Sequence, residues 1–120
     1  MRKRILVIDD DEDILEILHI IFQDEGYNVV ISNSSEAVDR IHEISPDLIL
    51  LDINIRGSAK NGAEICAEVK EHYPMLKSPV ILVSAETDIS IIAKECGADS
   101  FVRKPFDIYQ LLMRVKDFIN

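Results

Sequence analysis

Apolar residues recur along the chain in five short runs of strand length. The runs are Ile5–Ile8, Val29–Ile31, Leu48–Leu51, Val80–Val83 and Phe101–Val102. The first four are rich in Val, Ile or Leu and show no alternation with polar residues, which is typical of strands that are covered on both faces. The pattern therefore predicts five strands buried in one sheet.

Apolar residues with helical spacing occupy the segments between these runs. The apolar face of the helix predicted after the first strand consists of Ile14, Leu15, Leu18, Ile21 and Phe22. We expect Gly26 to end this helix, because glycine is the usual residue just past a helix C-terminus. Asn33 together with Glu36 indicates the start of a second helix that ends near Ile44.

The last segment repeats the helical pattern most completely. Asp107 is a candidate N-cap, with Gln110 three residues later. The predicted apolar face consists of Ile108, Leu111, Leu112, Val115, Phe118 and Ile119. We therefore expect the last element of the fold to be a helix.

Strand and helix thus alternate five times, which predicts an α/β fold with a parallel sheet and right-handed crossovers. For five strands the common doubly wound, three-layer arrangement has the strand order 2-1-3-4-5. We find no internal repeat, low-complexity tract or linker. We therefore expect one domain over residues 1–120, either stand-alone or excised from a longer protein.

The charge balance limits the partners. With 13 Lys and Arg against 22 Asp and Glu, the formal net charge is −9, which repels nucleic acid phosphates and argues against direct DNA binding. No apolar run reaches the roughly 18 residues of a membrane span, and the start of the chain is too short and too soon acidic for a signal peptide. We expect a cytoplasmic protein that does not use a membrane.

The two cysteines, Cys66 and Cys96, lie 30 positions apart with no CxxC motif or nearby histidine set. This spacing gives little support to a disulfide or a zinc site. Buried, reduced thiols are the expected state.

Acidic residues follow two of the predicted strands. Asp9 and Asp10 come after the first strand and Asp52 after the third, and these two strand ends meet at the switch point of a 2-1-3-4-5 sheet, where ligands bind. Three carboxylates in one place repel each other, and a hard divalent cation relieves that repulsion. Magnesium suits a site with few carboxylates because it keeps several water ligands.

Of two other interpretations of these acids, one remains open and one can be rejected. Asp10 or Asp11 could cap the helix that follows, where the helix dipole favours a negative charge. The alternation of Asp9, Asp11 and Asp13 also resembles a calcium-binding EF-hand loop, but Ile14 stands where that loop needs glycine and no glutamate occupies its twelfth position. We reject calcium on that ground.

Ser84 closes the fourth predicted strand and Lys104 follows the fifth. The same edge of the sheet would then carry acids, a hydroxyl group and an ammonium group. Phosphoryl transfer needs an in-line nucleophile and neutralisation of the equatorial phosphoryl oxygens, which a metal ion, a lysine and a hydroxyl can supply together. The set predicts phosphoryl chemistry.

Four segments in this order resemble the signature blocks of response-regulator receiver domains. They are Val7–Asp10, Leu50–Asp52, Val83–Ala85 and Gly97–Phe106, and together they span nearly the whole chain. The resemblance implies a flavodoxin-like fold. It also implies a two-component switch, not a small-substrate enzyme, which accepts a phosphoryl group from a sensor histidine kinase or a phosphotransfer protein. The output would be an unidentified downstream protein or an effector domain outside this segment.

The resemblance also assigns roles to individual residues. It implies that Asp52 is the phosphoacceptor and that Asp9, Asp10, Asp52 and the backbone carbonyl of Asn54 hold magnesium. Lys104 and Ser84 would contact the phosphoryl oxygens.

Phe101 would be the aromatic residue that changes rotamer on activation, although an aromatic in a short edge strand is also an ordinary packing residue. The Lys104–Pro105 bond would be cis, a state that X-Pro bonds reach at modest cost. Asn54 and Glu86, two positions beyond Asp52 and Ser84, would tune the lifetime of the phosphorylated state by controlling the attacking water.

The chain departs from the receiver pattern in two places. The usual Met-Pro pair after the phosphoacceptor is missing, and the glycine that follows, Gly62, comes about two residues late. The stretch from Ser84 to Lys104 is about two residues short. We therefore expect a longer, more mobile loop after Asp52 and a truncated or differently entered fourth helix.

Two other functions would fit the same fold. One is an interaction module that does not depend on phosphorylation, but such degenerate domains usually lack one of the functional residues. The other is a metal-dependent phosphatase with an aspartyl nucleophile. It would need a cap or substrate pocket, for which 120 residues leave little room.

Overall fold

The computed structural model describes residues 2–73 and 76–119, and its centre is a five-stranded parallel sheet. The strands are β1 (Arg4–Ile8), β2 (Asn28–Ser32), β3 (Leu48–Asp52), β4 (Val80–Ser84) and β5 (Ser100–Arg103). Their order is β2-β1-β3-β4-β5. The predicted α/β fold and strand order are therefore confirmed, and each strand begins or ends within one residue of its apolar run.

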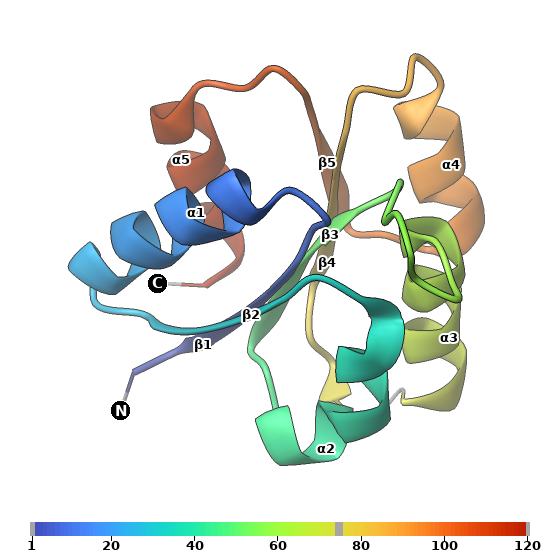
Figure 1. The fold of residues 1–120 in the computed structure, drawn as a ribbon, viewed down its shortest axis with the longest axis horizontal. Helices are drawn as coiled ribbons and strands as arrows, with labels where there is room; N and C mark the ends of the chain where they lie inside the picture. The colour runs from blue at the N-terminus through green and yellow to red at the C-terminus, as the bar shows by residue number, and fades with distance from the viewer. Residues whose placement is uncertain (1, 74–75, 120) are drawn as a thin grey trace.

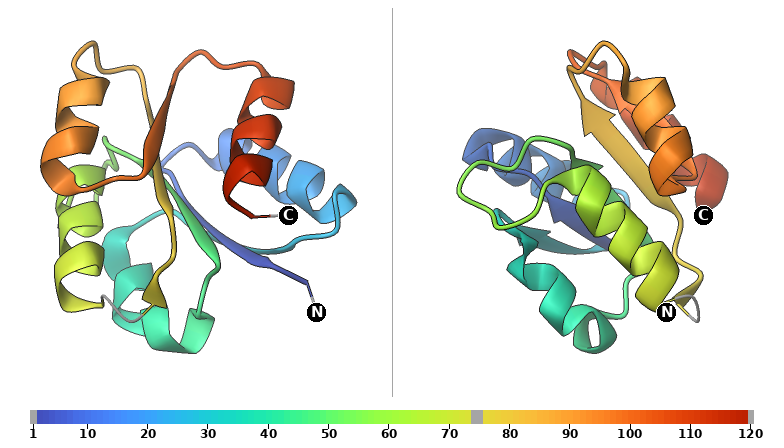
Figure 2. Two further views of the ribbon diagram at one scale, coloured as in Figure 1. Left: turned by 180° about the vertical axis from the view of Figure 1, so that it is seen from behind. Right: turned by 90° about the vertical axis from the view of Figure 1, so that its right-hand side faces the viewer.

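Helices cover both faces of the sheet, which gives three layers (Figures 1 and 2). On one side lie α1 (Glu12–Asp24) and α5 (Ile108–Phe118). On the other side lie the 3₁₀ helix η1 (Ser35–Arg40) and the helices α2 (Ile41–Ile44), α3 (Gly62–His72) and α4 (Ile89–Cys96). In Figure 1 the blue helix α1 and the red helix α5 lie on the same side of the sheet.

Alternate residues of each strand supply the two cores. Ile5 and Val7 of β1 pack on the side of α1 and α5, whereas Leu6 and Ile8 pack on the side of α2, α3 and α4. All five residues of β3 and of β4 are buried. This double coverage explains why the strands read as unbroken apolar runs in the sequence.

The first helix agrees with its prediction in extent. Gly26 follows its end with a φ of +95°, a left-handed conformation that glycine adopts without strain. The cap is Asp11, whose carboxylate accepts hydrogen bonds from the backbone N–H groups of Asp13 and Ile14.

The second predicted helix is only partly correct. The segment is not one helix that starts at Asn33 but a 3₁₀ helix followed by the single turn α2, and its N-cap is Ser34. The Ser34 hydroxyl accepts a hydrogen bond from the backbone of Glu36, so it caps one residue later than predicted. Asn33 instead donates its amide to the Glu12 carboxylate.

The apolar face predicted for the last helix is too wide. Leu111 and Val115 are buried, but Ile108 and Phe118 are 37% and 38% exposed. Those two residues are the first and last of α5. Ile119, the next residue along the chain, is buried as predicted. Asp107 caps the helix through the backbone N–H of Tyr109, as predicted.

Two smaller predictions concern α4 and the cysteines. The helix has eight residues, and its N-cap residue Asp88 makes no side-chain capping bond, which confirms a short fourth helix. Cys66 is buried and Cys96 is only partly buried, and both are free thiols. The expectation of two buried thiols is therefore wrong for Cys96, which ends α4 where its side chain reaches the surface.

Within the described residues, no helix combines the length and the apolar character that a membrane crossing needs.

Candidate functional site

Three carboxylates meet at the carboxyl edge of the sheet. Asp9 and Asp10 follow β1, and Asp52 is the last residue of β3. The two strands pair in register, with Ile8 opposite Leu51. One carboxylate oxygen from each of the three acids lies within 4.8 Å of the others. The predicted convergence of these strand ends is confirmed.

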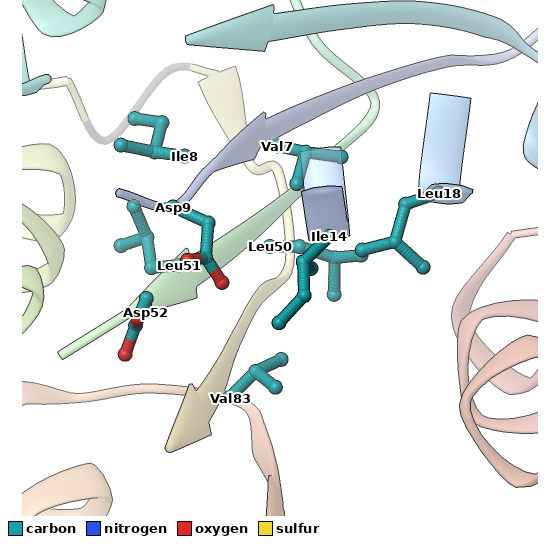
Figure 3. A pocket seen from close by; sticks show the side chains of 9 residues that line it. All are labelled: Val7, Ile8, Asp9, Ile14, Leu18, Leu50, Leu51, Asp52 and Val83. Atoms are coloured by element: carbon teal, nitrogen blue, oxygen red, sulfur yellow. The ribbon is translucent and has the colours of Figure 1, made fainter. Parts of the chain in front are cut away.

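Asp9 and Asp52 form the buried part of this group. Their side chains are 5% and 7% exposed. Figure 3 shows Asp9 and Asp52 together with the apolar residues that line a small pocket at the ends of β1 and β3, among them Ile14, Leu50 and Val83. The low exposed fractions leave the two acids little access to solvent water.

Lys104 supplies the opposing charge. Its Nζ lies 3.1 Å from Asp9 Oδ2 and 3.1 Å from Asp52 Oδ2, so the ammonium group bridges the two buried acids. The backbone N–H of Asn54 donates to the other oxygen of Asp52 at 3.2 Å, and that of Asp11 donates to Asp9 Oδ1 at 2.9 Å. Each buried carboxylate is therefore held at both oxygens.

These surroundings change the acidities of two groups. Burial and the charge of Asp9 raise the pKa of Asp52 to about 6, although Lys104 and the Asn54 amide act in the opposite direction. Burial lowers the pKa of Lys104, but the carboxylates of Asp52 and Asp9 outweigh that effect and raise it overall. The charge of Lys104 therefore does not offset burial and the charge of Asp9, and the pKa of Asp52 stays above its ordinary value.

Asp10 is not a helix cap, because Asp11 fills that role. The Asp10 carboxylate instead accepts two hydrogen bonds from Arg56, and its side chain is 18% exposed. Of the two open interpretations of these acids, capping applies to Asp11 and membership of the acidic cluster to Asp9, Asp10 and Asp52.

Asp10 and Asp52 line an open depression of about 210 Å³, and Asp9 lies behind it, joined to Asp52 through Lys104. The other residues that line the depression are Asp11, Asn54, Arg56, Ser84, Ala85 and Lys104. Ser84 is fully buried, and its hydroxyl accepts a hydrogen bond from the Glu86 backbone while its carbonyl accepts one from the Lys104 backbone. The predicted hydroxyl and ammonium groups therefore lie at the same depression as the acids.

Asn54 and Glu86 meet at the mouth of the depression. The Asn54 side-chain amide donates to Glu86 Oε1 at 2.6 Å, a contact between two loops 32 positions apart. Glu86 does not line the depression itself, but its carboxylate is bonded to Asn54, which does.

Phe101 is the predicted site residue that the structure leaves apart from the others. It is partly buried in β5 and packs against the core on the side of α3 and α4. The Arg103 guanidinium lies 5.8 Å from its ring centroid. The Lys104–Pro105 bond is cis, as the sequence predicted.

Sequence reasoning noted Gly62 only for its late position in the loop and did not name Arg56 as a site residue. Gly62 begins α3 against the backbone of Asp52, where a Cβ atom would lie 2.1 Å from the Asp52 carbonyl oxygen. Its signal was the Asn61–Glu64 capping box. Arg56 pairs with Asp10. The one sequence feature that hints at its place is the alternation of apolar and polar residues in the loop, in which Ile53 and Ile55 are buried.

The donor set fits a hard divalent cation. All three acidic ligands are oxygens that can approach one ion, and magnesium prefers a few carboxylates with its remaining positions left to water or substrate oxygens. No sulfur or imidazole ligand belongs to this group, so the chemistry of softer metals is not favoured.

Comparisons with known proteins agree with this geometry. A family model described as the response regulator receiver domain matches residues 5–116. A putative response regulator from Chloroflexus aurantiacus is 30% identical, covers 98% of each chain and superposes with a TM-score of 0.88. NtrX from Brucella abortus is 31% identical over 99% of this chain with a TM-score of 0.87, and this chain spans only 27% of the NtrX chain.

Two further solved structures extend the comparison. The BeF3-activated DrrB receiver domain is 31% identical, with coverage of 99% and 98% and a TM-score of 0.86. The chemotaxis protein CheY4 from Vibrio cholerae, at 23% identity and a TM-score of 0.88 over 99% of this chain and 100% of its own, supports the fold alone. With the family model matched over most of its length, this chain belongs to the response regulator receiver domain family.

Proposed function

We propose that Asp52 accepts a phosphoryl group from a phosphohistidine in a magnesium-dependent reaction, and that the domain thereby switches its partner binding. The observation that carries this proposal is the position of the Asp52 carboxylate. Asp52 is the last residue of a buried strand, and its carboxylate lies 3.1 Å from the Lys104 ammonium group. The carboxylate belongs to the acidic cluster and lies at an open depression.

The transfer uses groups that are already in place. A carboxylate oxygen of Asp52 attacks phosphorus in line, the phosphorus–nitrogen bond to the donor imidazole breaks, and its electron pair leaves with the imidazole nitrogen. Lys104 and the Ser84 hydroxyl bind the phosphoryl oxygens. A pKa of about 6 keeps most Asp52 carboxylates ionised, and so nucleophilic, at neutral pH.

The metal would be held by Asp9, Asp10, Asp52 and the backbone carbonyl of Asn54. When bound, magnesium neutralises negative charge on the phosphoryl oxygens. Asp9 and Asp10 contribute by keeping the cluster anionic, because their charges attract the cation and Lys104 alone does not balance them.

The switch would run from Ser84 to Phe101. Ser84 is the last residue of β4 and pairs with Arg103 of β5, two residues beyond Phe101. The Ser84 hydroxyl accepts a hydrogen bond from the Glu86 backbone, and its O–H can donate to a phosphoryl oxygen at the same time. A movement of Ser84 towards that oxygen would therefore be passed to the loop that carries Glu86. A rotamer change of the partly buried Phe101 would then alter the surface formed by α4 and β5.

The partners follow from this chemistry. The phosphoryl donor is a sensor histidine kinase or a phosphotransfer protein in the cytoplasm. The output is a downstream protein or an effector domain outside this segment, an arrangement supported by the much longer NtrX chain. The net charge of −9 argues against direct contact with nucleic acid by this domain.

Intact-mass spectrometry after incubation with acetyl phosphate tests the proposal. We expect one phosphoryl group on the wild type with magnesium, and none on Asp52→Asn or after chelation. Asp24→Asn, an exposed carboxylate at the end of α1, is the matched control and should be labelled like the wild type. Equal labelling of Asp52→Asn and wild type, or labelling that chelation does not reduce, would contradict the proposal.

A further inference from the structure

Arg56 makes a contact with the acidic cluster that the proposed reaction does not use. Its backbone N–H and its Nε each lie 3.2 Å from the same oxygen, Asp10 Oδ2. The Arg56 side chain is 94% exposed, whereas that of Asp10 is 18% exposed. A solvated cation therefore lies over the outermost acid of the cluster.

The fold of the loop after β3 holds Arg56 in this place. Ile53 and Ile55 are buried, and the residues between and after them, Asn54 and Arg56, line the depression. The Ser58 N–H bonds to the Ile55 carbonyl at 3.2 Å, and Gly57 has a φ of +77°. These contacts form a tight turn with Arg56 at its corner, so the backbone directs Arg56 to Asp10.

We infer that Arg56 is a positioning residue that competes with the divalent cation for Asp10. This inference rests on the proposed function, because it takes Asp10 to be a metal ligand. The guanidinium group neutralises Asp10 while the metal is absent. A bound cation would meet both a carboxylate oxygen that already accepts two hydrogen bonds and a positive charge beside it.

The competition couples metal binding to the loop. Arg56 belongs to the segment that also carries Asn54, whose side chain bridges to Glu86 at the mouth of the depression. Release of Asp10 by Arg56 removes one of the contacts that tie this segment to β1. The wild-type chain therefore needs a higher magnesium concentration to fill the site than its three carboxylates alone would require.

Isothermal titration of chelator-treated protein with magnesium chloride tests the inference. Because the ion pair is exposed, its effect is modest, and we expect Arg56→Ala to bind magnesium about threefold more tightly than the wild type. Arg56→Lys keeps the charge and should stay within about twofold of the wild type. Arg40→Ala removes the same charge from an exposed pair with Glu43 and should leave the affinity unchanged.

The outcomes separate this inference from the proposed function. If the wild type binds no magnesium, the proposed function fails. If it binds magnesium and Arg56→Ala binds no more tightly, or Arg40→Ala tightens binding equally, only the competition is wrong. Affinity of Arg56→Lys equal to that of Arg56→Ala would likewise overturn it.

A second readout follows the guanidinium group itself. In nitrogen-15 NMR spectra, the Arg56 Nε–H signal should shift during the magnesium titration with the same midpoint as binding. A signal that stays constant through saturation would overturn the inference.

Discussion

The buried and the exposed parts of the site are built differently. The buried part, called the floor below, consists of Asp9, Asp52, Ser84 and Lys104, which lie at or just after the ends of strands. The exposed part, called the rim below, consists of Asn54, Arg56 and Glu86, which lie on loops and bond to one another or to Asp10. The exposed fraction rises from 7% for the Asp52 side chain to 94% for that of Arg56.

This difference separates two kinds of energetic effect. A change in the balance of buried charges can raise or lower the free energy of unfolding by several kcal/mol, whereas an exposed pair contributes about 0–1 kcal/mol. We therefore expect substitutions in the floor to act on folding and on the occurrence of the reaction. Substitutions in the rim should change rates and affinities by small factors.

Gly62→Ala should produce the largest change in stability, because Gly62 packs directly against the backbone of Asp52. A Cβ atom there would lie 2.1 Å from the Asp52 carbonyl oxygen, so α3 must move away from β3. We expect a loss of roughly 3 kcal/mol or more in the free energy of unfolding, measured by urea denaturation.

Gly26→Ala is the control for this measurement. Gly26 has a φ of +95° but nothing within 4 Å of an added Cβ atom, so only backbone strain should count, at about 1 kcal/mol. Equal losses for the two variants would show that the close approach of α3 to Asp52 is not important for stability.

Asp52→Asn should stabilise the metal-free domain at neutral pH. The carboxyl pKa is about 6 in the folded state against an ordinary value of 3.8, so the folded state binds the proton more tightly than the unfolded state. The contribution of Asp52 to stability therefore increases as the pH falls from 7 towards 4, and it is unfavourable above the folded pKa.

The asparagine variant lacks this titration. We expect it to exceed the wild type by roughly 2 kcal/mol at pH 7 in urea denaturation with chelator present, and the gap should narrow at pH 5. The other acids titrate in both proteins, so their contributions cancel in the difference between the two free energies of unfolding. A gap that is the same at both pH values would show that burial of the Asp52 charge does not control stability.

The contrast between floor and rim also explains what the sequence could predict. Buried strands give a clear apolar pattern, and the residues that follow them are brought together by the topology alone. Asp9, Asp52, Ser84 and Lys104 could therefore be located from β1, β3, β4 and β5. Arg56 could not, because its contact depends on a turn at Gly57 and on the burial of Ile55.

The same reasoning applies to the helices. The exposure of Ile108 and Phe118 was missed because helical spacing gives the face on which a residue lies but not how closely the sheet covers it there. The start of η1 was placed one residue too early because Asn33 and Ser34 are equally good caps, and the tertiary contact of Asn33 with Glu12 separates them.

The bridge between Asn54 and Glu86 should control the lifetime of phosphorylated Asp52. Both side chains can orient an attacking water, and neither carries the charge stabilisation. We expect Asn54→Met, Glu86→Leu and the double variant to lengthen the lifetime by about tenfold, which corresponds to 1.4 kcal/mol in the barrier.

Because the two side chains share one hydrogen bond of 2.6 Å, the double variant should gain less than the product of the single effects. Glu86→Gln keeps an acceptor for Asn54 and is the control, with a lifetime near that of the wild type. Dephosphorylation is measured at saturating magnesium. If all three variants decay like the wild type, water access is controlled elsewhere, and the loop 56–61 becomes the next segment to test.

Asp10 and Asp11 provide the smallest and most direct comparison, because they are neighbours with opposite expected effects. Asp11→Ala removes the cap of α1 and should lower the free energy of unfolding by about 1 kcal/mol. Asp10→Asn removes one charge from a repulsive cluster and should raise the apo melting temperature. Arg56 already offsets part of that repulsion, so the gain should be only about 0.5 kcal/mol.

Magnesium titration then separates the two roles. Asp10→Asn should weaken magnesium binding although it stabilises the fold, because the cation loses a carboxylate ligand. Asp11→Ala should bind magnesium nearly as well as the wild type although it destabilises the fold, because its carboxylate is occupied by the backbone of Asp13 and Ile14. Opposite signs in stability and affinity cannot arise from general damage to the domain. Unchanged magnesium affinity in Asp10→Asn would instead show that Asp10 serves only as the acceptor for Arg56.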